Sequence, residues 1–419
     1  MSRTVRRRSM QAIEHRDKHD MQSAASHCPP STVARAEVQA LRSSKIREVA
    51  NAGMDRKDIL PFWFGEPDEE TPDEICGAAI AALENRRTFY VQTLGEPALR
   101  EEIARYLSRW HGPIGVERVA VTSSGTHALM LALQALLNPG DRVVAVTPLW
   151  PNLVEMPKVL GAHVETVALQ FTAAGWVLDE QRLLEALRPG TRALLLNAPN
   201  NPTGWTLSRE SQQAILAHCR RLGIWIVSDD VYQRISFDAP CAPSFLDIAT
   251  PEDRVISCNS FSKAWRMTGW RLGWIVVPPA MLGDIGKLIE YSSTCAPPFV
   301  QAAGVVALAR GEDAIARTVE RLRQGRDHLA ARLGSVPGVE LAAPARGAMY
   351  TFFRVDGVTD SLAFCKQLVA EAGLGLAPGV AFGPEGEGYL RWCYASGTPR
   401  LDDGVRRLAA YLEHHPTTR

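Results

Sequence analysis

The chain has 419 residues, of which 46% are hydrophobic. It can therefore bury one large core or two smaller ones, since single domains commonly run to roughly 100 to 200 residues. Lys and Arg together number 46, as do Asp and Glu, so the formal net charge is zero. Without a net positive charge, no global field attracts nucleic acid or an anionic membrane surface. We expect neither as a partner, and any anion that the protein binds must be held by a local site.

The eight cysteines are scattered along the chain, with no CxxC pair and no repeated interval. This spacing is typical of reduced thiols rather than of a disulfide framework or a zinc site. No apolar stretch approaches the roughly 20 residues that a membrane helix needs, and the first residues lack the pattern of a secretory signal. These features predict a cytoplasmic protein.

Residues 1–30 are polar and begin with a cluster of arginines. Low hydrophobicity of this kind favours a disordered tail. An organelle-targeting peptide is the alternative, against which Glu14 and Asp17 count, because such peptides are poor in acidic residues. His15 and His19 are four residues apart and suit a metal on one helix face, but a solvated polar segment is the simpler interpretation. We predict no metal site in the chain.

Between residues 118 and 278, short β-branched or apolar runs alternate with helical patterns. This alternation is typical of strands joined by crossover helices in a largely parallel sheet. Helices are expected at 126–137 and 208–222, the first apolar nearly all round and therefore buried. The predicted fold class is α/β, with a large domain built on a mostly parallel sheet flanked by helices. Its strand candidates are residues 118–122, 142–146, 164–169, 192–197, 224–228, 255–259 and 272–277.

A smaller α+β domain is predicted towards the C-terminus. A long helical region at 279–333 gives way to strands and further helices, and the N-terminal segment near residues 61–64 is expected to complete the small sheet. Both chain ends would then build this domain. In the small domain the predicted strands are 347–355 and 389–394, and the predicted helices are 361–372 and 401–414. The chain as a whole is predicted to divide into an N-terminal segment at 31–75, a large domain at 76–310 and a small domain at 311–419.

Polar residues directly after the predicted strands are the first candidates for a site, because ligands of parallel α/β sheets bind beyond the carboxyl ends of the strands. Ser124 and Thr126 stand where a strand runs into a helix, a place that suits a phosphate but also suits plain N-caps. Residues 197–204 form either a rigid polar loop with side-chain amides or an ordinary turn. Asp229 and Asp230 indicate a metal or a buried cation partner, and the lack of a nearby histidine or third carboxylate argues against the metal.

The most informative stretch is residues 260–271, where Lys263 follows a strand end among hydroxyl groups and Arg271 comes after it. A lysine is rarely buried without a partner. A desolvated lysine readily loses its proton and becomes an amine nucleophile for carbonyl compounds.

With these residues in place, the sequence resembles the class I and II aminotransferase family of the fold type I pyridoxal-phosphate (PLP) enzymes over roughly residues 31–415. Any one motif could arise by chance, but their common order favours the resemblance. Two positions depart from the usual pattern, Trp205 and Arg266, and both could reshape the entrance of a site. The ordered markers are Gly65 to Asp68, Tyr90 to Glu101, Asn201 to Gly204, Asp229 with Tyr232, the Lys263 stretch, and Phe382-Gly383 leading to Tyr389, Leu390 and Arg391.

The resemblance implies PLP as cofactor and catalytic roles for Lys263, Asp229 and Tyr232. Lys263 would carry PLP covalently and move a proton between the substrate α-carbon and the cofactor. Asp229 would pair with the pyridine nitrogen and keep it protonated, so that the ring can accept electrons. Asn201 and Tyr232 would bind the phenolic oxygen. Trp150 would stack on the ring, unless it is simply a core tryptophan.

The resemblance also implies residues for the phosphate, the neighbouring subunit and the substrate. The phosphate set is Ser124, Gly125, Thr126, Ser260, Ser262 and Arg271. Tyr90 would reach the phosphate of the other subunit of a homodimer, and is otherwise a surface residue. Arg391 would bind the substrate α-carboxylate, with a backbone contact from Gly65 and with Trp63, Phe64 and Asn201 nearby; an ordinary ion pair is the alternative for Arg391.

The expected reaction transfers an amino group from an L-amino acid to a 2-oxo acid through pyridoxamine phosphate. One alternative is another PLP reaction, such as that of a carbon-sulfur β-lyase, a decarboxylase or a racemase. A non-catalytic PLP-sensing regulator is disfavoured, because about 30 residues ahead of the resemblance are too few for a DNA-binding domain. The substrate stays open: Trp63, Phe64 and Trp205 hint at an apolar or aromatic preference, and an acidic substrate needs a second cation that the sequence does not identify.

Overall fold

The computed structural model of the protein describes residues 34–415. The chain divides into two compact units, Met1–Ala40 and Leu41–Arg419. The described part of the first unit holds the short helix α1 (Ala36–Gln39). The predicted tail, with His15 and His19, lies outside the described residues.

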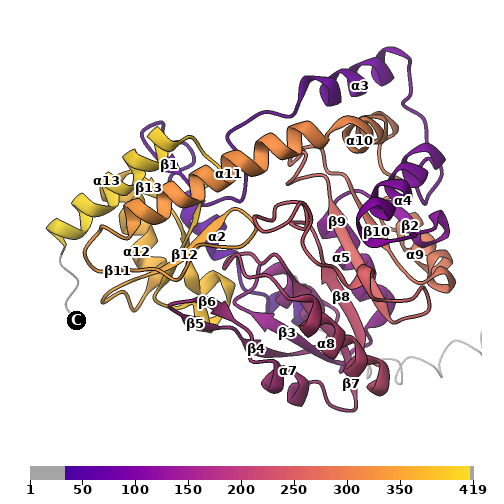
Figure 1. Cartoon of the computed structure of the whole chain (residues 1–419), viewed down its shortest axis with the longest axis horizontal. Coiled ribbons are helices and arrows are strands. Elements are labelled where there is room, and N and C mark those ends of the chain that lie inside the picture. Colours follow the sequence, from indigo (N-terminus) through magenta and orange to yellow (C-terminus); the bar gives the residue numbers. More distant parts are fainter. Residues whose placement is uncertain (1–33, 416–419) are drawn as a thin grey trace, which may run out of the picture. The chain divides into compact units, whose positions relative to one another are not determined.

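The centre of the second unit is a seven-stranded sheet with the order β2-β10-β9-β8-β7-β3-β4. Strand β10 runs antiparallel to both its neighbours and the other pairs are parallel, which confirms the mostly parallel sheet. Figure 1 shows β7, β8 and β9 side by side. The strands are β2 (Val119–Thr122), β3 (Arg142–Thr147), β4 (His163–Ala168), β7 (Thr191–Asn197), β8 (Trp225–Asp229), β9 (Val255–Ser260) and β10 (Gly273–Val276).

An apolar cluster covers each face of this sheet, and successive strand residues contribute to the two clusters in turn because their side chains point to opposite sides. Val143 and Val227 belong to one apolar cluster, whereas Val144 and Ile226 belong to another on the opposite face. The first cluster includes residues of α5 (Gly125–Leu136), α6 (Asn152–Val159) and α9 (Leu282–Glu290), and the second those of α7 (Glu180–Ala186) and α8 (Arg209–Leu222). Towards β2 and β10, α10 (Pro298–Arg310) packs on α3 (Asp73–Glu84) and α4 (Pro97–His111).

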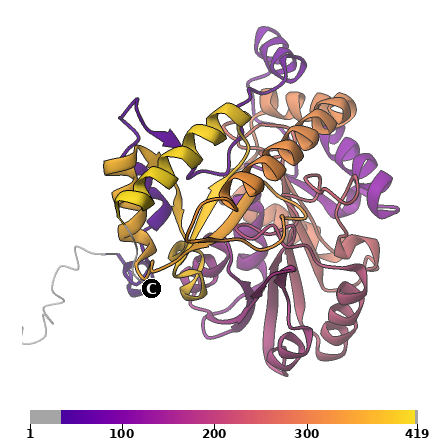
Figure 2. The ribbon, with the colours of Figure 1, turned by 60° about the vertical axis from the view of Figure 1, so that its left-hand side comes forward.

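A four-stranded antiparallel sheet forms the smaller part, with the order β11-β12-β15-β14. Figures 1 and 2 show the long helix α11 (Glu312–Leu333) beside α13 (Thr398–His414) over this part. The strands are β11 (Val339–Glu340), β12 (Tyr350–Val355), β14 (Ala377–Pro378) and β15 (Tyr389–Cys393). Helices α2 (Lys45–Asn51) and α12 (Ser361–Gln367) lie against this sheet, and a π-helical turn (Leu368–Ala372) contacts α12 and α13. The hairpin β5 (Gln170–Thr172) and β6 (Gly175–Val177) is a separate two-stranded sheet, and its Trp176 packs against Phe352 of β12.

The expectation that residues 61–64 complete the small sheet is wrong. The N-terminal strand is β1 (Leu60–Pro61), which pairs in parallel with β13 (Leu374–Gly375) as a separate two-stranded sheet. The Leu60 and Phe62 amides donate to the Gly373 and Gly375 carbonyls, each at 2.8 Å. Pro61, which has no backbone donor, lies between them and costs this pairing no hydrogen bond. The segment still runs alongside β15, since the Cys393 amide donates to the Phe62 carbonyl at 3.2 Å.

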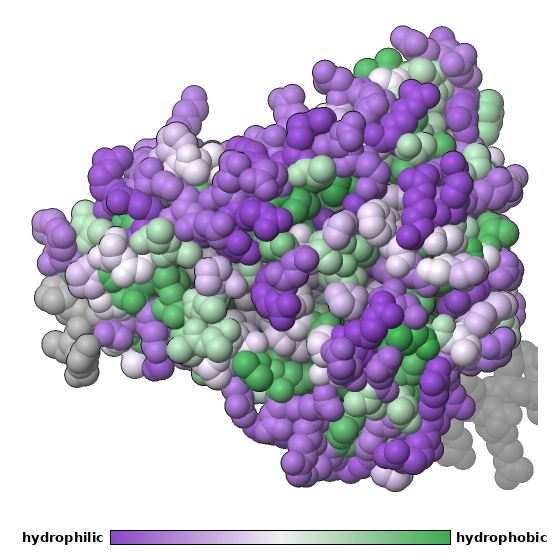
Figure 3. Space-filling model, viewed as in Figure 1, coloured by the Kyte–Doolittle hydropathy of each residue, from purple (hydrophilic) through white to green (hydrophobic). Residues whose placement is uncertain are grey.

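No helix among residues 34–415 is long and apolar enough to cross a membrane. On the face seen in Figure 3, polar side chains cover most of the surface and the hydrophobic areas are broken up.

Candidate active site

A cavity of about 830 Å³ lies beyond the carboxyl ends of β7, β8 and β9. This is the edge at which parallel sheets bind ligands. Ser124 adjoins the cavity as the N-cap of α5, whereas Tyr90 is 86% exposed and does not line it. The predicted residues that the fold brings together on its wall are Trp63, Phe64, Gly65, Gly125, Thr126, Trp150, Asn201, Asp229, Tyr232, Ser260, Ser262, Lys263, Arg271 and Arg391.

Lys263 lies in the turn that follows β9 and donates from Nζ to the Gly65 carbonyl at 2.6 Å. Burial lowers the pKa of this amine to about 8, with the Arg391 and Arg271 cations acting in the same direction and Cys393 and Glu66 opposing. A large share of the lysine is therefore neutral near pH 8. A neutral, buried amine has the reactivity that attack on a carbonyl carbon requires.

Gly65 lines the cavity, and its backbone packs tightly against Tyr350. A Cβ atom built on it would lie 1.7 Å from the Tyr350 hydroxyl oxygen, so no larger residue fits. The Gly65 carbonyl can reach Lys263 because of this close approach.

Asp229 ends β8 with its carboxylate in the cavity. Its backbone carbonyl accepts from Asn197 Nδ2 at 3.0 Å, and its Oδ1 accepts from the Val231 amide at 3.3 Å. Burial raises the pKa of Asp229 to about 7, and the neighbouring Asp230 charge adds to this, while the Val231 bond and Lys263 oppose it. A buried carboxylate with a raised pKa is stabilised by a cation placed beside it.

Tyr232 and Tyr350 meet across the two parts of the second unit, their hydroxyl oxygens 2.6 Å apart. Burial raises the pKa of Tyr232 well above its usual value, so its hydroxyl is protonated and can donate. The Lys263 ammonium lies 5.8 Å from the centre of the Tyr232 ring. Sequence reasoning missed Tyr350, because only the docking of β12 against the loop after β8 brings it here.

Arg391 of β15 is buried in the same wall. Its Nη1 donates to Asn201 Oδ1 at 3.1 Å and its Nη2 donates to the Trp63 carbonyl. The guanidinium carbon lies 4.5 Å from the centre of the Tyr350 ring. Nε has no hydrogen-bond partner among the described residues. No carboxylate of the described residues pairs with Arg391, so the ion-pair alternative is not observed, and a ligand carboxylate would satisfy the charge.

The N-terminus of α5 faces the cavity through Gly125 and Thr126, and the first amides of a helix lack partners within the helix. Gly125 packs so tightly that a Cβ there would lie 2.9 Å from Ser260 Cβ. Ser260 Oγ donates to Ser262 Oγ at 2.8 Å, and Arg271 Nη1 lies 3.4 Å from Ser262 Oγ. Hydroxyls, helix amides and a guanidinium therefore converge at one end of the cavity.

Arg47 of α2 lines the cavity and was not identified from the sequence. It is exposed, and its guanidinium carbon lies 5.0 Å from the centre of the Phe64 ring. Within residues 34–415 this guanidinium has no hydrogen-bond or ion-pair partner. The segment from Trp63 to Gly65 thus touches three cations in succession, Arg391, Arg47 and Lys263.

Two departures from the family pattern lie away from the cavity lining. Trp205 is buried in the cluster on the α8 face and does not line the cavity. It therefore gives no support to an aromatic or apolar substrate. Arg266 pairs with Glu69 at 3.0 Å. Among residues 34–415, no group of three or more His, Cys, Asp or Glu side chains is placed to hold a metal ion.

The fold and the site define an α/β enzyme whose single cavity brings together a helix N-terminus with hydroxyls and a guanidinium, a carboxylate and a buried amine. Residues 57–408 match the sequence model of the family "Aminotransferase class I and II". An aspartate aminotransferase of Pyrococcus horikoshii is 33% identical over 377 residues, which cover 89% of this chain and 95% of that protein. An arginine–pyruvate transaminase of Pseudomonas aeruginosa is 32% identical over 356 residues, 84% of this chain and 90% of that one.

Among solved structures, a single mutant of the aspartate aminotransferase of Thermus thermophilus superposes with a TM-score of 0.84 at 30% identity, covering 90% of this chain and 99% of that one. The chain belongs to the class I and II aminotransferase family. The predicted resemblance and the predicted fold class are confirmed.

Proposed function

We propose that the protein transfers an amino group from an L-amino acid to a 2-oxo acid by means of PLP attached to Lys263. The observation that carries this proposal is the buried Lys263 amine, with its pKa lowered to about 8, on one cavity wall with Asp229 and Arg391. The names of the three relatives above all describe amino-group transfer, and none of them favours a lyase.

The residues present fit PLP. Gly125, whose Cβ position is closed by Ser260, lets backbone amides reach the phosphate, and Arg271 supplies its countercharge. The raised pKa of Asp229, to about 7, suits a protonated ring nitrogen as its partner. Asn201 and Tyr232 would hold the phenolic oxygen, and Trp150 would cover a ring face. Bound PLP supplies an aldehyde for covalent attachment of amines and a ring that accepts electrons.

The substrate is held and deprotonated by other groups of the chain. Arg391 binds the α-carboxylate through its guanidinium, which can form two parallel hydrogen bonds to one carboxylate. Lys263, in its neutral form, takes the proton from the α-carbon and later returns it. The Gly65 carbonyl keeps the amine directed into the cavity, since it accepts from Nζ at 2.6 Å.

Arg47 indicates which side chains the pocket accepts. Among residues 34–415 its guanidinium has no hydrogen-bond or ion-pair partner, and it stacks on Phe64, next to Gly65, whose carbonyl contacts Lys263. A carboxylate on the far end of a substrate would pair with it, whereas a cationic side chain would be repelled. Dicarboxylic amino and oxo acids are therefore the proposed substrate class.

The proposed assembly is a homodimer in which Tyr90 of one subunit completes the phosphate site of the other. Tyr90 and Phe89 are 86% and 81% exposed, which is unusual for adjacent large aromatic residues on a free surface. Loss of PLP affinity in Tyr90→Phe, with a dimer retained in sedimentation, supports a shared site. A monomeric wild-type protein with full activity contradicts it.

Borohydride reduction of the PLP-loaded enzyme, followed by peptide mapping, tests the proposed function. We expect label at Lys263 and a Lys263→Ala variant without turnover. Label at another position, or turnover by the variant, contradicts the proposal. Release of pyruvate and ammonia without any oxo-acid acceptor would identify a lyase instead.

A further inference from the structure

Asp230 directly follows Asp229, but its side chain lies on the other side of the sheet. Along β8, Val227 packs in the apolar cluster of α5 and Ile226 in that of α8, since alternate residues face opposite sides. Asp229 continues the first series and reaches the cavity. Asp230 continues the second, is 1% exposed and does not line the cavity.

Three serine hydroxyls hold the Asp230 carboxylate. Ser228 Oγ donates to Oδ1 at 2.6 Å, while Ser257 Oγ and Ser244 Oγ donate to Oδ2 at 2.5 Å and 3.1 Å. Ser244 Oγ itself accepts from the Leu246 amide at 3.2 Å, so its proton is free for Asp230. Burial raises the pKa of Asp230, and the serine hydroxyls and His111 oppose this rise. Donors on every side favour the charged form of a carboxylate.

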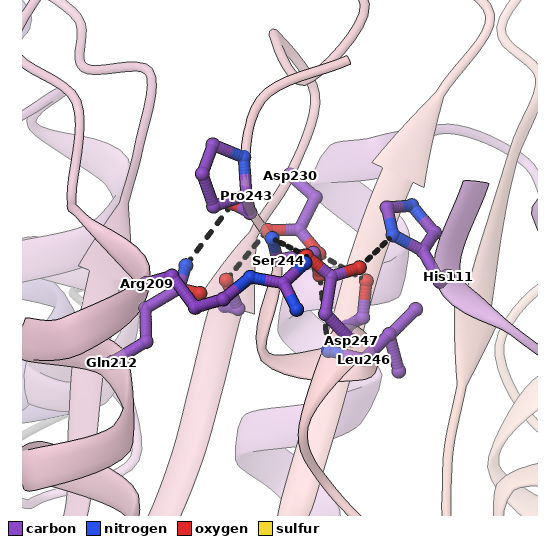
Figure 4. A network of polar contacts seen from close by, with 10 residues as sticks. His111, Arg209, Gln212, Asp230, Pro243, Ser244, Leu246 and Asp247 are labelled. Carbon is purple, nitrogen blue, oxygen red and sulfur yellow. Dashed lines mark hydrogen bonds and ion pairs between the residues drawn. The ribbon is translucent and has the colours of Figure 1, made fainter.

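The polar contacts continue from Ser244 to the protein surface (Figure 4). The Ser244 amide donates to Asp247 Oδ2 at 3.1 Å, and His111 Nδ1 donates to Asp247 Oδ1 at 2.6 Å. Arg209 Nη2 reaches the same carboxylate at 3.0 Å. Half of the Arg209 side chain is exposed, and exposed ion pairs contribute little. The buried Asp230 end is therefore the firmer part of this network.

The backbone links Asp230 to Asp229. The Asp230 amide donates to the Cys258 carbonyl at 2.9 Å, and the Gln233 amide donates to the Asp230 carbonyl at 2.9 Å. The Val231 amide between these anchors is the donor that Asp229 Oδ1 accepts from, at 3.3 Å. Anchoring Asp230 to β9 and to the 244–247 turn thus fixes the segment that directs Asp229.

We infer that Asp230 is a positioning residue for Asp229: its serine-held carboxylate fixes the backbone from which Asp229 faces the cavity, and its negative charge strengthens the hold of Asp229 on a protonated cofactor nitrogen. This inference rests on the proposed function, because it requires Asp229 to face PLP. No residue of the network touches the cavity except through Asp229, so the effect of Asp230 is indirect.

The test compares Asp230→Asn with Asp247→Asn, which removes a charge from the same network further from Asp229. Apoenzyme is titrated with PLP by absorbance, and the bound cofactor is titrated with pH. For Asp230→Asn we expect PLP to bind about tenfold more weakly and the pH midpoint to fall by about one unit, the shift that corresponds to a tenfold change. The sign follows because losing a negative charge disfavours the protonated form, whichever cofactor nitrogen takes up the proton. Asp247→Asn should stay within about twofold of wild type.

The inference is overturned if Asp230→Asn lowers only the melting temperature of the apoenzyme and leaves the PLP affinity and the pH midpoint unchanged. Asp230 would then have a structural role alone. If Asp230→Asn does not fold, Ser257→Ala replaces it. That variant loses one hydrogen bond, so PLP should bind about threefold more weakly, and wild-type affinity overturns the inference. Asp229→Asn separates the two proposals. If Asp229→Asn binds PLP with wild-type affinity and midpoint, the pairing of Asp229 with PLP is refuted. If Asp229→Asn changes the affinity or the midpoint and Asp230→Asn changes neither, only the role of Asp230 is refuted.

Discussion

The lowered pKa of Lys263 predicts the pH at which the apoenzyme takes up its cofactor covalently. Only the neutral amine attacks an aldehyde. With a pKa of about 8, about one quarter of Lys263 is neutral at pH 7.5, against roughly 0.1% of an unperturbed lysine with a pKa of about 10.4. The pKa of Lys263 falls because burial destabilises its charged form. The neutral amine therefore predominates above about pH 8, whereas in a free lysine it predominates only above about pH 10.

Stopped-flow absorbance on mixing apoenzyme with PLP between about pH 6 and about pH 10 measures this, with free Nα-acetyl-lysine as the reference amine. Both second-order rate constants should rise in parallel at low pH. Above about pH 8 the protein rate should level off while the reference continues to rise, so their ratio should fall by about 70-fold at pH 10. A ratio that stays flat across this range would refute the lowered pKa of Lys263. Dividing by the reference removes the titration of PLP itself.

Three substitutions test the rest of the site. Arg391→Ala should raise KM for every amino acid by about 100-fold, because it removes a buried partner of the α-carboxylate, while bound PLP stays stoichiometric by absorbance; loss of the cofactor together with substrate binding would contradict the assignment. Arg47→Gln should raise KM for aspartate and 2-oxoglutarate by about fivefold, the effect of roughly 1 kcal/mol, and leave KM for alanine unchanged. The matched control is Arg42→Gln, because Arg42 is exposed and does not line the cavity. An equal rise in KM for alanine would rule out recognition of the distal carboxylate. Gly65→Ala places a methyl group 1.7 Å from the Tyr350 hydroxyl oxygen, so the free energy of unfolding in urea titrations should fall by about 1 to 3 kcal/mol. The double variant Gly65→Ala/Tyr350→Phe should recover part of this loss. Unchanged stability of the single variant would show that the close approach does not exist.

Local patterns predicted most of the large sheet. The predicted strand at 142–146 is β3 (Arg142–Thr147), and the predicted strand at 164–169 is β4 (His163–Ala168). The central strand β3 is buried on both faces, so its sequence is nearly continuously apolar and easy to recognise. The expected sheet partner of residues 61–64 was wrong because strand pairing at a distance is not encoded in the segment itself. A proline and three aromatic residues there fit several neighbours equally well.

The candidate site divides in the same way. Residues that directly follow strands, such as Asp229 and Lys263, could be predicted from the sequence because the carboxyl ends of parallel strands meet at one edge. Tyr350 and Arg47 could not, since each enters the cavity from another part of the unit and carries no motif.

The sequence by itself determined the order of the strands along the chain, the helix that begins at Gly125 directly after a strand, and the positions of Lys263 and Asp229 at strand ends, because these features depend on neighbours within a few residues. Only the tertiary structure decided how deeply Lys263 is buried, where the Asp230 side chain lies and that Arg47 and Tyr350 line the cavity. Those properties depend on the faces that packed elements present to one another, and therefore on contacts between residues hundreds of positions apart.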